Sequence, residues 1–381
     1  MTSNAAPKKV TVSVIKADVG SIGGHTRPTP EMLAAVRAEL NRATADGTII
    51  DGMVCHTGDD IAMIVSHTHG VGASSVHVDL AWKAFIEATK VASEQGNYGA
   101  GQDLLVDAPS GNVRGAGPAV AEIEFDLLPS YRPAESFMLF AADKCAPGAY
   151  NLPLYLAFCD PMHNGGLLLN PRLHEGFTLT IMDMDAHEGD RVIKLDVPEQ
   201  AWDVCALLRD MDRFAIEAIH SRAFPDEQVA SISTTRLHNI AGEYTGMDER
   251  IALVRNQGIF PAPEELIEPY FITHYVTGDA RGSHTMPLMP VALNTPVSGA
   301  FCLPIVSCIG FSMDGQGRFA KNYVDFFGDV SWDTTRQQAQ HKAVEIRRQG
   351  FFGVAMASQT EIAYTGLIDT LNKLDSNFKI R

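Results

Sequence analysis

Acidic side chains follow several apolar stretches of this sequence, at the point where each stretch ends. The stretches VSVIKA, MVCHTG and FMLFAA, and the glycine-containing turn EYTGM, each precede such residues, and the loop YGAGQD carries two more oxygen-bearing side chains. Because an apolar strand delivers its last residue to the edge of a sheet, we expect these side chains to converge in one cleft. In chain order the residues are Asp18, Asp59, Asp60, Gln102, Asp103, Asp143, Asp248 and Glu249.

A cluster of carboxylates of this kind repels itself unless cations neutralise it. Carboxylate, amide and water oxygens are the ligands that hard cations prefer, so the pattern predicts a Mg²⁺ site. The alternative is that each acid caps a turn or faces solvent alone. The residues by themselves leave that alternative open. It is weakest for the adjacent pair Asp59 and Asp60, because neighbouring like charges after an apolar strand have no evident role in folding.

Several other polar residues are candidates for chemistry. His25 lies in a glycine-rich loop and, taken alone, is typical of a surface or hydrogen-bonded histidine. Lys144 follows Asp143 directly, where it would either bridge a metal-bound phosphate or face solvent. His67 and His69 alternate without a third ligand at a recognisable spacing, so we do not expect a zinc site. Two candidate anion-binding segments, each weak evidence by itself, are Gly111–Gly117 with Arg114, and Arg281–His284.

Composition excludes several classes of partner. The chain has 381 residues, with 30 Lys and Arg against 46 Asp and Glu, which is a formal net charge of −16. Nucleic acids and anionic membranes need a basic face, so we exclude both, whereas a small phosphorylated substrate is compatible where bound cations reverse the local sign. No run approaches the roughly 18 apolar residues of a membrane-spanning helix. The start MTSNAAPKK lacks the apolar core of a signal peptide, and six cysteines without a C-x-x-C pair indicate buried thiols in a reducing cytoplasm.

The spacing of apolar residues predicts both strands and helices. We expect strands at 11–17, 49–55, 61–65, 119–127, 136–142, 178–184 and 251–254. We expect helices at 30–46, from 76 to near Gly96, at 198–211 and at 333–348. Strand pairs and helices mix without a regular βαβ alternation, which favours an α+β layered sandwich over a doubly wound parallel sheet. No linker stands out. We therefore expect a flexible N-terminal arm at residues 1–10 and a single catalytic domain at residues 11–381.

Long motifs of the chain match those of a known family. On these stretches the chain resembles the archaeal-type (class V) fructose 1,6-bisphosphate aldolase/phosphatase family, from about residue 11 to the C-terminus. The resemblance implies a single-domain, four-layer α-β-β-α sandwich assembled as a homo-octamer. It also implies an enzyme that binds several Mg²⁺ ions, condenses two triose phosphates through a lysine Schiff base and then removes the 1-phosphate. The matching stretches are SVIKADVGSIGGH (13–25), HTGDD (56–60), YGAGQDLL (98–105), SGNVRGAGP (110–118), ADKCAPGAYNLPLY (142–155), PRLHEGF (171–177), RGSH with PLMPV (281–291) and TEIAYT (360–365).

The same resemblance implies roles for individual residues. Matching tyrosines assist the aldol chemistry at Tyr244 and Tyr364, and phosphate chemistry would fall to Asp59, Asp60 and Lys144. Positions that hold substrate phosphates or sugar hydroxyls are Tyr98, Asn112, Lys144, Gln257 and Arg281. The implied metal ligands are Asp18, His25, Asp59, Asp60, Gln102, Asp143, Asp248 and Glu249, the last standing where the family usually has aspartate.

The chain departs from the family pattern in three places. Met247 stands where the family has its Schiff-base lysine, and the nearest lysines in sequence are Lys194 and Lys321. A thioether has no amine and cannot form an imine. Glu243 replaces a common lysine, and residues 297–304 (VSGAFCLP) lack the acid and the arginine of the family's F-D-G-P-P-R segment. Three changes together indicate natural divergence rather than one engineered substitution.

Three functions are compatible with this pattern. The favoured one is a Mg²⁺-dependent sugar-phosphate phosphatase, by default acting on fructose 1,6-bisphosphate, that has lost the imine-based aldolase step. The second is a Mg²⁺-dependent aldolase or lyase on another sugar substrate, in which Tyr244 and Tyr364 still move protons. The third is a non-catalytic relative that keeps the metal-bound fold, against which the retained acids argue.

Overall fold

Strand β1 (Lys9–Ala17) lies at the centre of the smaller of two large sheets in the computed structural model, which describes residues 9–104, 117–185, 190–236, 250–277, 285–299, 302–348 and 366–380. Neighbouring strands of this sheet run antiparallel. In order across the sheet they are β10 (Thr235–Arg236), β4 (Ala119–Asp126), β1, β3 (Asp60–His67) and β2 (Asp51–Thr57). Because successive side chains of a strand point to opposite faces, Val12 and Val14 face the second sheet while Ile15 and Ala17 face a layer of helices.

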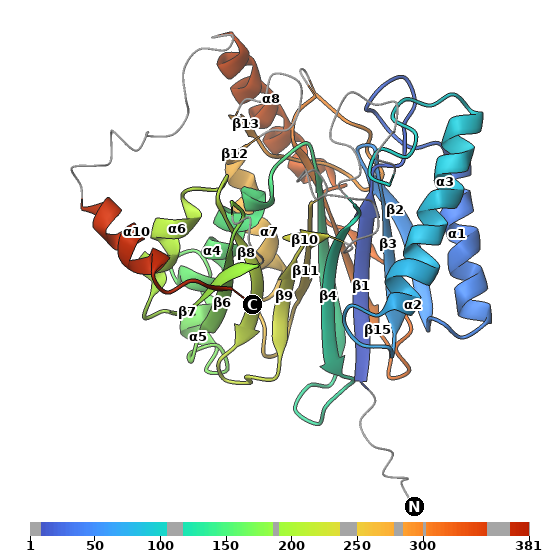
Figure 1. Cartoon of the computed structure of the whole chain (residues 1–381). Coiled ribbons are helices and arrows are strands. Elements are labelled where there is room, and N and C mark those ends of the chain that lie inside the picture. The colour runs from blue at the N-terminus through green and yellow to red at the C-terminus, as the bar shows by residue number, and fades with distance from the viewer. Residues whose placement is uncertain are drawn as a thin grey trace, which may run out of the picture.

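That helical layer covers the outer face of the smaller sheet (Figure 1). It consists of α1 (Pro30–Ala45), α2 (Ser74–Val76), the π-helical segment η1 (His77–Trp82) and α3 (Lys83–Glu94). The predicted start of α1 is confirmed, because the Thr29 hydroxyl accepts a hydrogen bond from the Met32 N–H and Pro30 occupies the first turn. The predicted order strand, helix, strand, strand, helix over the first hundred residues is likewise confirmed.

The larger sheet has ten strands in the described part of the chain. Its order is β14 (Met289–Pro290), β15 (Ile305–Met313), β5 (Glu135–Asp143), β11 (Arg250–Arg255), β9 (Gln228–Ile232), β8 (Phe214–Ser221), β6 (Phe177–Asp183), β7 (Arg191–Val197) and β17 (Lys379–Ile380), with β16 (Val324–Asp325) paired to β15. A separate two-stranded ribbon joins β12 (Tyr275–Thr277) and β13 (Thr285–Pro287). The sequence patterns predicted β5, β6 and β11 but missed β7, β8, β9 and β15.

Helices cover the outer face of the larger sheet. They are η2 (Pro147–Tyr150), α4 (Asn151–Cys159), α5 (Gly166–Leu169), α6 (Ala201–Leu208), α7 (Pro263–Ile267) and η3 (Glu268–Ile272). Phe140 of β5 packs in one buried cluster with Phe158 of α4 and Leu207 of α6. Each fully buried side chain of this size contributes about 1.5–3 kcal/mol. Helices, two sheets and helices therefore form four layers, so the predicted α-β-β-α sandwich is confirmed.

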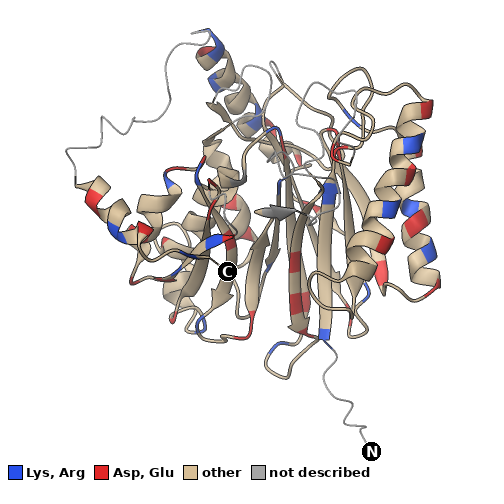
Figure 2. Cartoon of the chain, viewed as in Figure 1, with Lys and Arg blue, Asp and Glu red and all other residues tan. Residues whose placement is uncertain are grey.

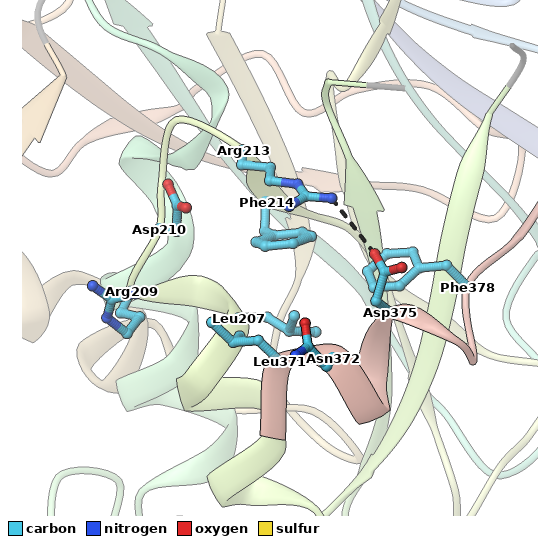
Figure 3. A pocket seen from close by; sticks show the side chains of 9 residues that line it. All are labelled: Leu207, Arg209, Asp210, Arg213, Phe214, Leu371, Asn372, Asp375 and Phe378. Atoms are coloured by element: carbon cyan, nitrogen blue, oxygen red, sulfur yellow. Dashed lines mark ion pairs between the residues drawn. The ribbon is translucent and has the colours of Figure 1, made fainter. Parts of the chain in front are cut away.

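Two more helices lie towards the C-terminus. The short segment η4 (Val330–Trp332) leads into α8 (Asp333–Arg347), whose Ala339 and Ala343 pack against β13 and β14. Helix α10 (Leu367–Asp375) lies beside α6, and Arg213 pairs with Asp375 at 3.6 Å across a cavity of about 80 Å³ (Figure 3). This cavity lies where α10 packs against the rest of the protein, and none of the site residues expected from the sequence line it.

Some expectations need correction. The helix expected at 198–211 is only α6, because turns at residues 198–200 and around 210 close both of its ends. Four of the six cysteines are buried as expected, but Cys205 and Cys302 are exposed; all six are free thiols. β1 begins at Lys9, two residues earlier than expected. No helix among the described residues is long and apolar enough to cross a membrane.

Candidate active site

Four aspartates meet where strands of both sheets end. Asp18 follows β1, Asp59 lies in the turn between β2 and β3, Asp60 begins β3, and Asp143 ends β5. β1, β2 and β3 belong to the smaller sheet and β5 to the larger one. The facing ends of two packed sheets therefore supply these four carboxylates. Figure 2 shows acidic segments in the loops at the upper end of β1.

A tight hairpin turn brings Asp59 against Asp143. Gly58 adopts a φ of 61°, in the left-handed region that a two-residue hairpin favours for glycine. Its N–H donates to the Thr295 carbonyl oxygen at 2.9 Å, and the Asp59 N–H donates to Asp143 Oδ2 at 3.3 Å. A Cβ atom at Gly58 would overlap the Asp143 carboxylate. The glycine is therefore needed for both its backbone conformation and its lack of a side chain.

His25 closes one side of the cluster. Its Nδ1 lies 3.0 Å from Asp59 Oδ2 and 3.6 Å from Asp18 Oδ2. The Tyr98 ring packs edge-on against the imidazole, with 4.9 Å between centroids, so Tyr98 lies beside the cluster. The Asp18 N–H donates to Asp103 Oδ2 at 2.7 Å, which ties the loop carrying Gln102 and Asp103 to the end of β1. Gln102 is itself buried, beside Asp103.

Lys144 supplies a cation at the mouth of the cluster. Its Nζ lies 2.5 Å from Asp59 Oδ1 and 3.0 Å from Asp143 Oδ1. Its side chain keeps 14% exposure, so solvent reaches it. The backbone φ of Lys144 is 63°, a conformation that costs a non-glycine residue of order 1–3 kcal/mol and is found most often at functional sites.

Burial and neighbouring charges shift the pKa values of these aspartates in different directions. Burial raises the pKa of Asp143 to about 7, against the opposing attraction of Lys144. Burial and repulsion by Asp59 raise the pKa of Asp18 to about 6. Burial opposes ionisation of Asp59 as well, but the Lys144 ammonium and the hydrogen bond from His25 hold its pKa well below the usual range.

Burial by itself would lower the pKa of both cationic partners. Hydrogen bonds to Asp18 and Asp59 nevertheless raise the pKa of His25 to about 10. The charges of Asp143 and Asp59 raise the pKa of Lys144 well above its ordinary value. Asp59 therefore remains an ionised carboxylate between two protonated cations.

The donor set fits a hard divalent cation. Asp18, His25 and Asp59 each offer one ligand atom within 4.8 Å of the others, and so do Asp59, Asp60 and Asp143. Asp59 belongs to both groups, so adjacent ions would share it. Carboxylate oxygens with one imidazole and no thiolate suit Mg²⁺ rather than a softer metal.

Comparison with known proteins agrees with this geometry. Residues 9–379 match the protein family described as fructose-1,6-bisphosphatase. The fructose-1,6-bisphosphate aldolase/phosphatase of Thermus thermophilus is 53% identical over 97% of this chain and 99% of its own length. Those of Cenarchaeum symbiosum and Thermococcus kodakarensis are 45% and 42% identical, over 97% and 98% of this chain and 94% and 99% of their own lengths. The chain belongs to the fructose-1,6-bisphosphate aldolase/phosphatase family.

Within this aldolase/phosphatase fold, one residue with an expected substrate role lies away from the acids. Because β11 pairs antiparallel with β5, Arg250 lies opposite Ala142 beside the acid cluster and Arg255 lies opposite Phe137. Gln257 follows β11 at the far end of the sheet, two residues beyond Arg255, which by the usual rise per strand residue lies about 20 Å along the sheet from Asp143. The structure therefore does not bring Gln257 into the cluster of this chain.

Other expected residues lie outside the described part of the aldolase/phosphatase chain. They are Asn112, Arg114, Tyr244, Met247, Asp248, Glu249, Arg281 and Tyr364, together with most of both candidate anion-binding segments. Their roles stay predictions. The pair His67 and His69 is described and has other partners: His67 Nε2 contacts Ser13 Oγ at 2.7 Å, and His69 Nε2 donates to the Thr48 carbonyl oxygen at 2.8 Å.

Sequence reasoning missed one charged residue of the aldolase/phosphatase site. Lys16 of β1 is completely buried and its Nζ donates to Asp60 Oδ2. A signal was present, because a lysine occupies the same strand face as Val12 and Val14, two residues before Asp18. A charge at an inward-facing position of an apolar strand needs a buried partner.

Proposed function

We propose that this chain is a Mg²⁺-dependent phosphatase that hydrolyses fructose 1,6-bisphosphate to fructose 6-phosphate and phosphate. The observation that carries the proposal is the pair of ligand groups sharing Asp59, with the Lys144 ammonium 2.5 Å from the same carboxylate. Two adjacent cation sites beside a solvent-reachable lysine suit a phosphoryl group, whose oxygens need several positive charges at once.

The roles of the residues follow from their contacts. Asp18, His25, Asp59, Asp60 and Asp143 would hold the ions, with Gln102 as an expected further ligand. Bound Mg²⁺ would supply polarisation of the phosphoryl group and an activated water. Lys144 would exchange its contacts with Asp59 and Asp143 for phosphoryl oxygens and stabilise the charge that develops on them. Tyr98, beside His25, would pack against the sugar.

We also propose that the imine-based aldolase step is lost in this chain. Imine formation requires an unprotonated amine, and Met247 offers a thioether at the position where the resemblance implies the lysine. The replaced segment at residues 297–304 weakens the default choice of fructose 1,6-bisphosphate among sugar phosphates. The single domain over residues 11–381, the cytoplasmic location and the homo-octameric assembly remain proposals, and the octamer rests on the resemblance alone.

The decisive experiment measures phosphate release from fructose 1,6-bisphosphate with and without Mg²⁺. We expect release by the unaltered protein with Mg²⁺, and a loss of at least a hundredfold in kcat for Asp59→Asn, because that variant removes the charge shared by both ligand groups. Asp46→Asn is the matched control, since Asp46 is exposed at the end of α1 and should leave kcat unchanged.

Two outcomes would contradict the proposal. A folded protein that binds Mg²⁺ but releases no phosphate would exclude fructose 1,6-bisphosphate as the substrate. Formation of fructose 1,6-bisphosphate from two triose phosphates without phosphate release would favour the metal-dependent aldolase instead, for which the retained Tyr244 and Tyr364 are the proton-transferring candidates.

A further inference from the structure

Lys16 occupies an unusual position for a charged residue. Val10, Val12, Val14 and Lys16 alternate along β1, and the three valines pack in the apolar core between the two sheets. Lys16 therefore follows the three valines on the same face of β1, at the end of the strand that leads to the acid cluster. No part of its side chain is exposed, and its Nζ donates to Asp60 Oδ2, where Asp60 is itself 2% exposed.

Burying an ammonium in this way is costly unless a partner repays the lost hydration. Asp60 is that partner, and the same carboxylate belongs to the ligand group formed with Asp59 and Asp143. The Asp60 carboxylate therefore accepts from the fixed Lys16 ammonium and is also a candidate ligand of a bound metal ion. The two functions compete for the oxygens of one carboxylate.

The second lysine of the site differs in every relevant respect. Lys144 is partly exposed and adopts a left-handed backbone conformation after the end of β5. Lys144 is able to exchange its carboxylate contacts for a phosphate from solvent. Lys16 lies within β1, which pairs with a strand on each side, and its side chain is completely buried. Neither solvent nor substrate therefore reaches it.

We propose that Lys16 is a positioning residue that acts as a built-in counter-cation of the metal site. Its ammonium occupies one oxygen of Asp60, holds the carboxylate in place before any ion arrives, and limits how tightly the cluster binds divalent cations. The inference deepens the proposed function and rests on it only for the identity of the physiological cation. A residue that merely filled the core would not influence metal affinity in this direction.

The test measures Mn²⁺ binding by the electron paramagnetic resonance signal of the free ion, in the unaltered protein and in Lys16→Met. Methionine is unbranched and apolar like the stem of lysine, is one atom shorter, and carries no charge. We expect Mn²⁺ to bind at least threefold more tightly to Lys16→Met, because the ammonium no longer occupies Asp60 Oδ2 and the cluster gains net negative charge. Unchanged or weaker binding in the folded variant would overturn the proposal.

Arg132→Met is the matched control. Arg132 is also a buried cation paired with a carboxylate, Glu135, which begins β5 at the end opposite Asp143. The control removes a comparable buried charge near the other end of β5 and leaves the acid cluster alone. We expect its Mn²⁺ affinity to equal that of the unaltered protein. Tighter binding in the control as well would show a general effect of lost positive charge and would contradict the role of Lys16.

A second pair of variants covers the case in which Lys16→Met does not fold. Asp60→Asn removes the carboxylate charge that faces the Lys16 ammonium, whereas the double variant Lys16→Met with Asp60→Asn removes both charges. We expect Mn²⁺ to bind more tightly to the double variant than to Asp60→Asn. Equal binding by the two would overturn the proposal.

The outcomes separate this inference from the proposed function. Tighter Mn²⁺ binding by Lys16→Met, with no phosphate release by the unaltered protein, would contradict the phosphatase and leave the role of Lys16 standing. Phosphate release by the unaltered protein, with unchanged Mn²⁺ affinity in Lys16→Met, would support the phosphatase and contradict the role of Lys16.

Discussion

Asp59 is the residue on which the candidate chemistry converges. It belongs to both ligand groups, accepts from His25 and Lys144, and donates its backbone N–H to Asp143. Two lysines pair with the aspartates around it: Lys144 is reachable from solvent, and Lys16 is completely buried. The resemblance implies an imine-forming lysine at position 247, where this sequence has methionine.

Restoring that amine is a test at the scale of one residue. We expect Met247→Lys to be trapped by borohydride in the presence of dihydroxyacetone phosphate, since reduction converts an imine into a stable amine. Mass spectrometry would show the added mass in this variant and in neither the unaltered protein nor Met247→Leu. Trapping of the unaltered protein would reveal another imine-forming lysine and would contradict the loss of the aldolase step.

At the scale of elements, the β2–β3 hairpin determines where Asp59 and Asp60 lie. Thr57 pairs with Asp60 across the turn, and the Thr57 hydroxyl contacts Ser307 Oγ of β15 at 2.6 Å. The hairpin of the smaller sheet is thereby joined to the larger sheet beside the acids. Its tip has no space for a side chain at Gly58, so the close approach of the two sheets depends on that glycine.

Gly58→Ala is therefore expected to be more harmful than an ordinary glycine substitution. We expect a loss of at least tenfold in kcat and of Mn²⁺ affinity, because the new methyl group displaces the Asp143 carboxylate. Gly47→Ala is the matched control: its φ of 81° carries a similar backbone cost of roughly 1–2 kcal/mol, but a Cβ there meets no atom within 4 Å. Equal kcat values for the two variants would show that backbone strain alone matters at Gly58.

At the scale of the whole molecule, a cluster of buried ionisable groups lies where the two packed sheets end. Asp18, Asp143 and His25 all have folded-state pKa values, about 6, 7 and 10, above their ordinary values of 3.8, 3.8 and 6.5. The stability that each contributes is fully present below its ordinary value and is lost as the pH rises through the folded value. Asp59, whose pKa is lowered, contributes constantly above its ordinary value of 3.8.

Global unfolding should therefore depend on pH and on metal. In a chelator we expect the melting temperature to fall as the pH rises from about 7 to about 9, because His25 loses its proton there. The buried His67 and His274 have lowered pKa values of about 4 and are neutral in both the folded and the unfolded chain over this range. We expect the rise in melting temperature produced by Mg²⁺ to grow over the same range, since Mg²⁺ binds ionised carboxylates. Scanning fluorimetry at each pH measures both. Asp143→Asn should flatten the part of the curve near pH 7. A metal-free melting temperature that rises over this range would refute the assignment.

The amino-acid sequence alone was enough to predict the layered α+β class, most strands of the smaller sheet, and the acids at strand ends. These features are local: an apolar run followed by aspartate shows both the strand and its terminal ligand. Only the tertiary structure decided that the acids come from two sheets, that Gln257 lies at the far end of β11, and that Lys16 is the partner of Asp60. Pairing between distant strands, and the desolvation that forces a buried lysine to find a carboxylate, depend on packing rather than on neighbours in sequence.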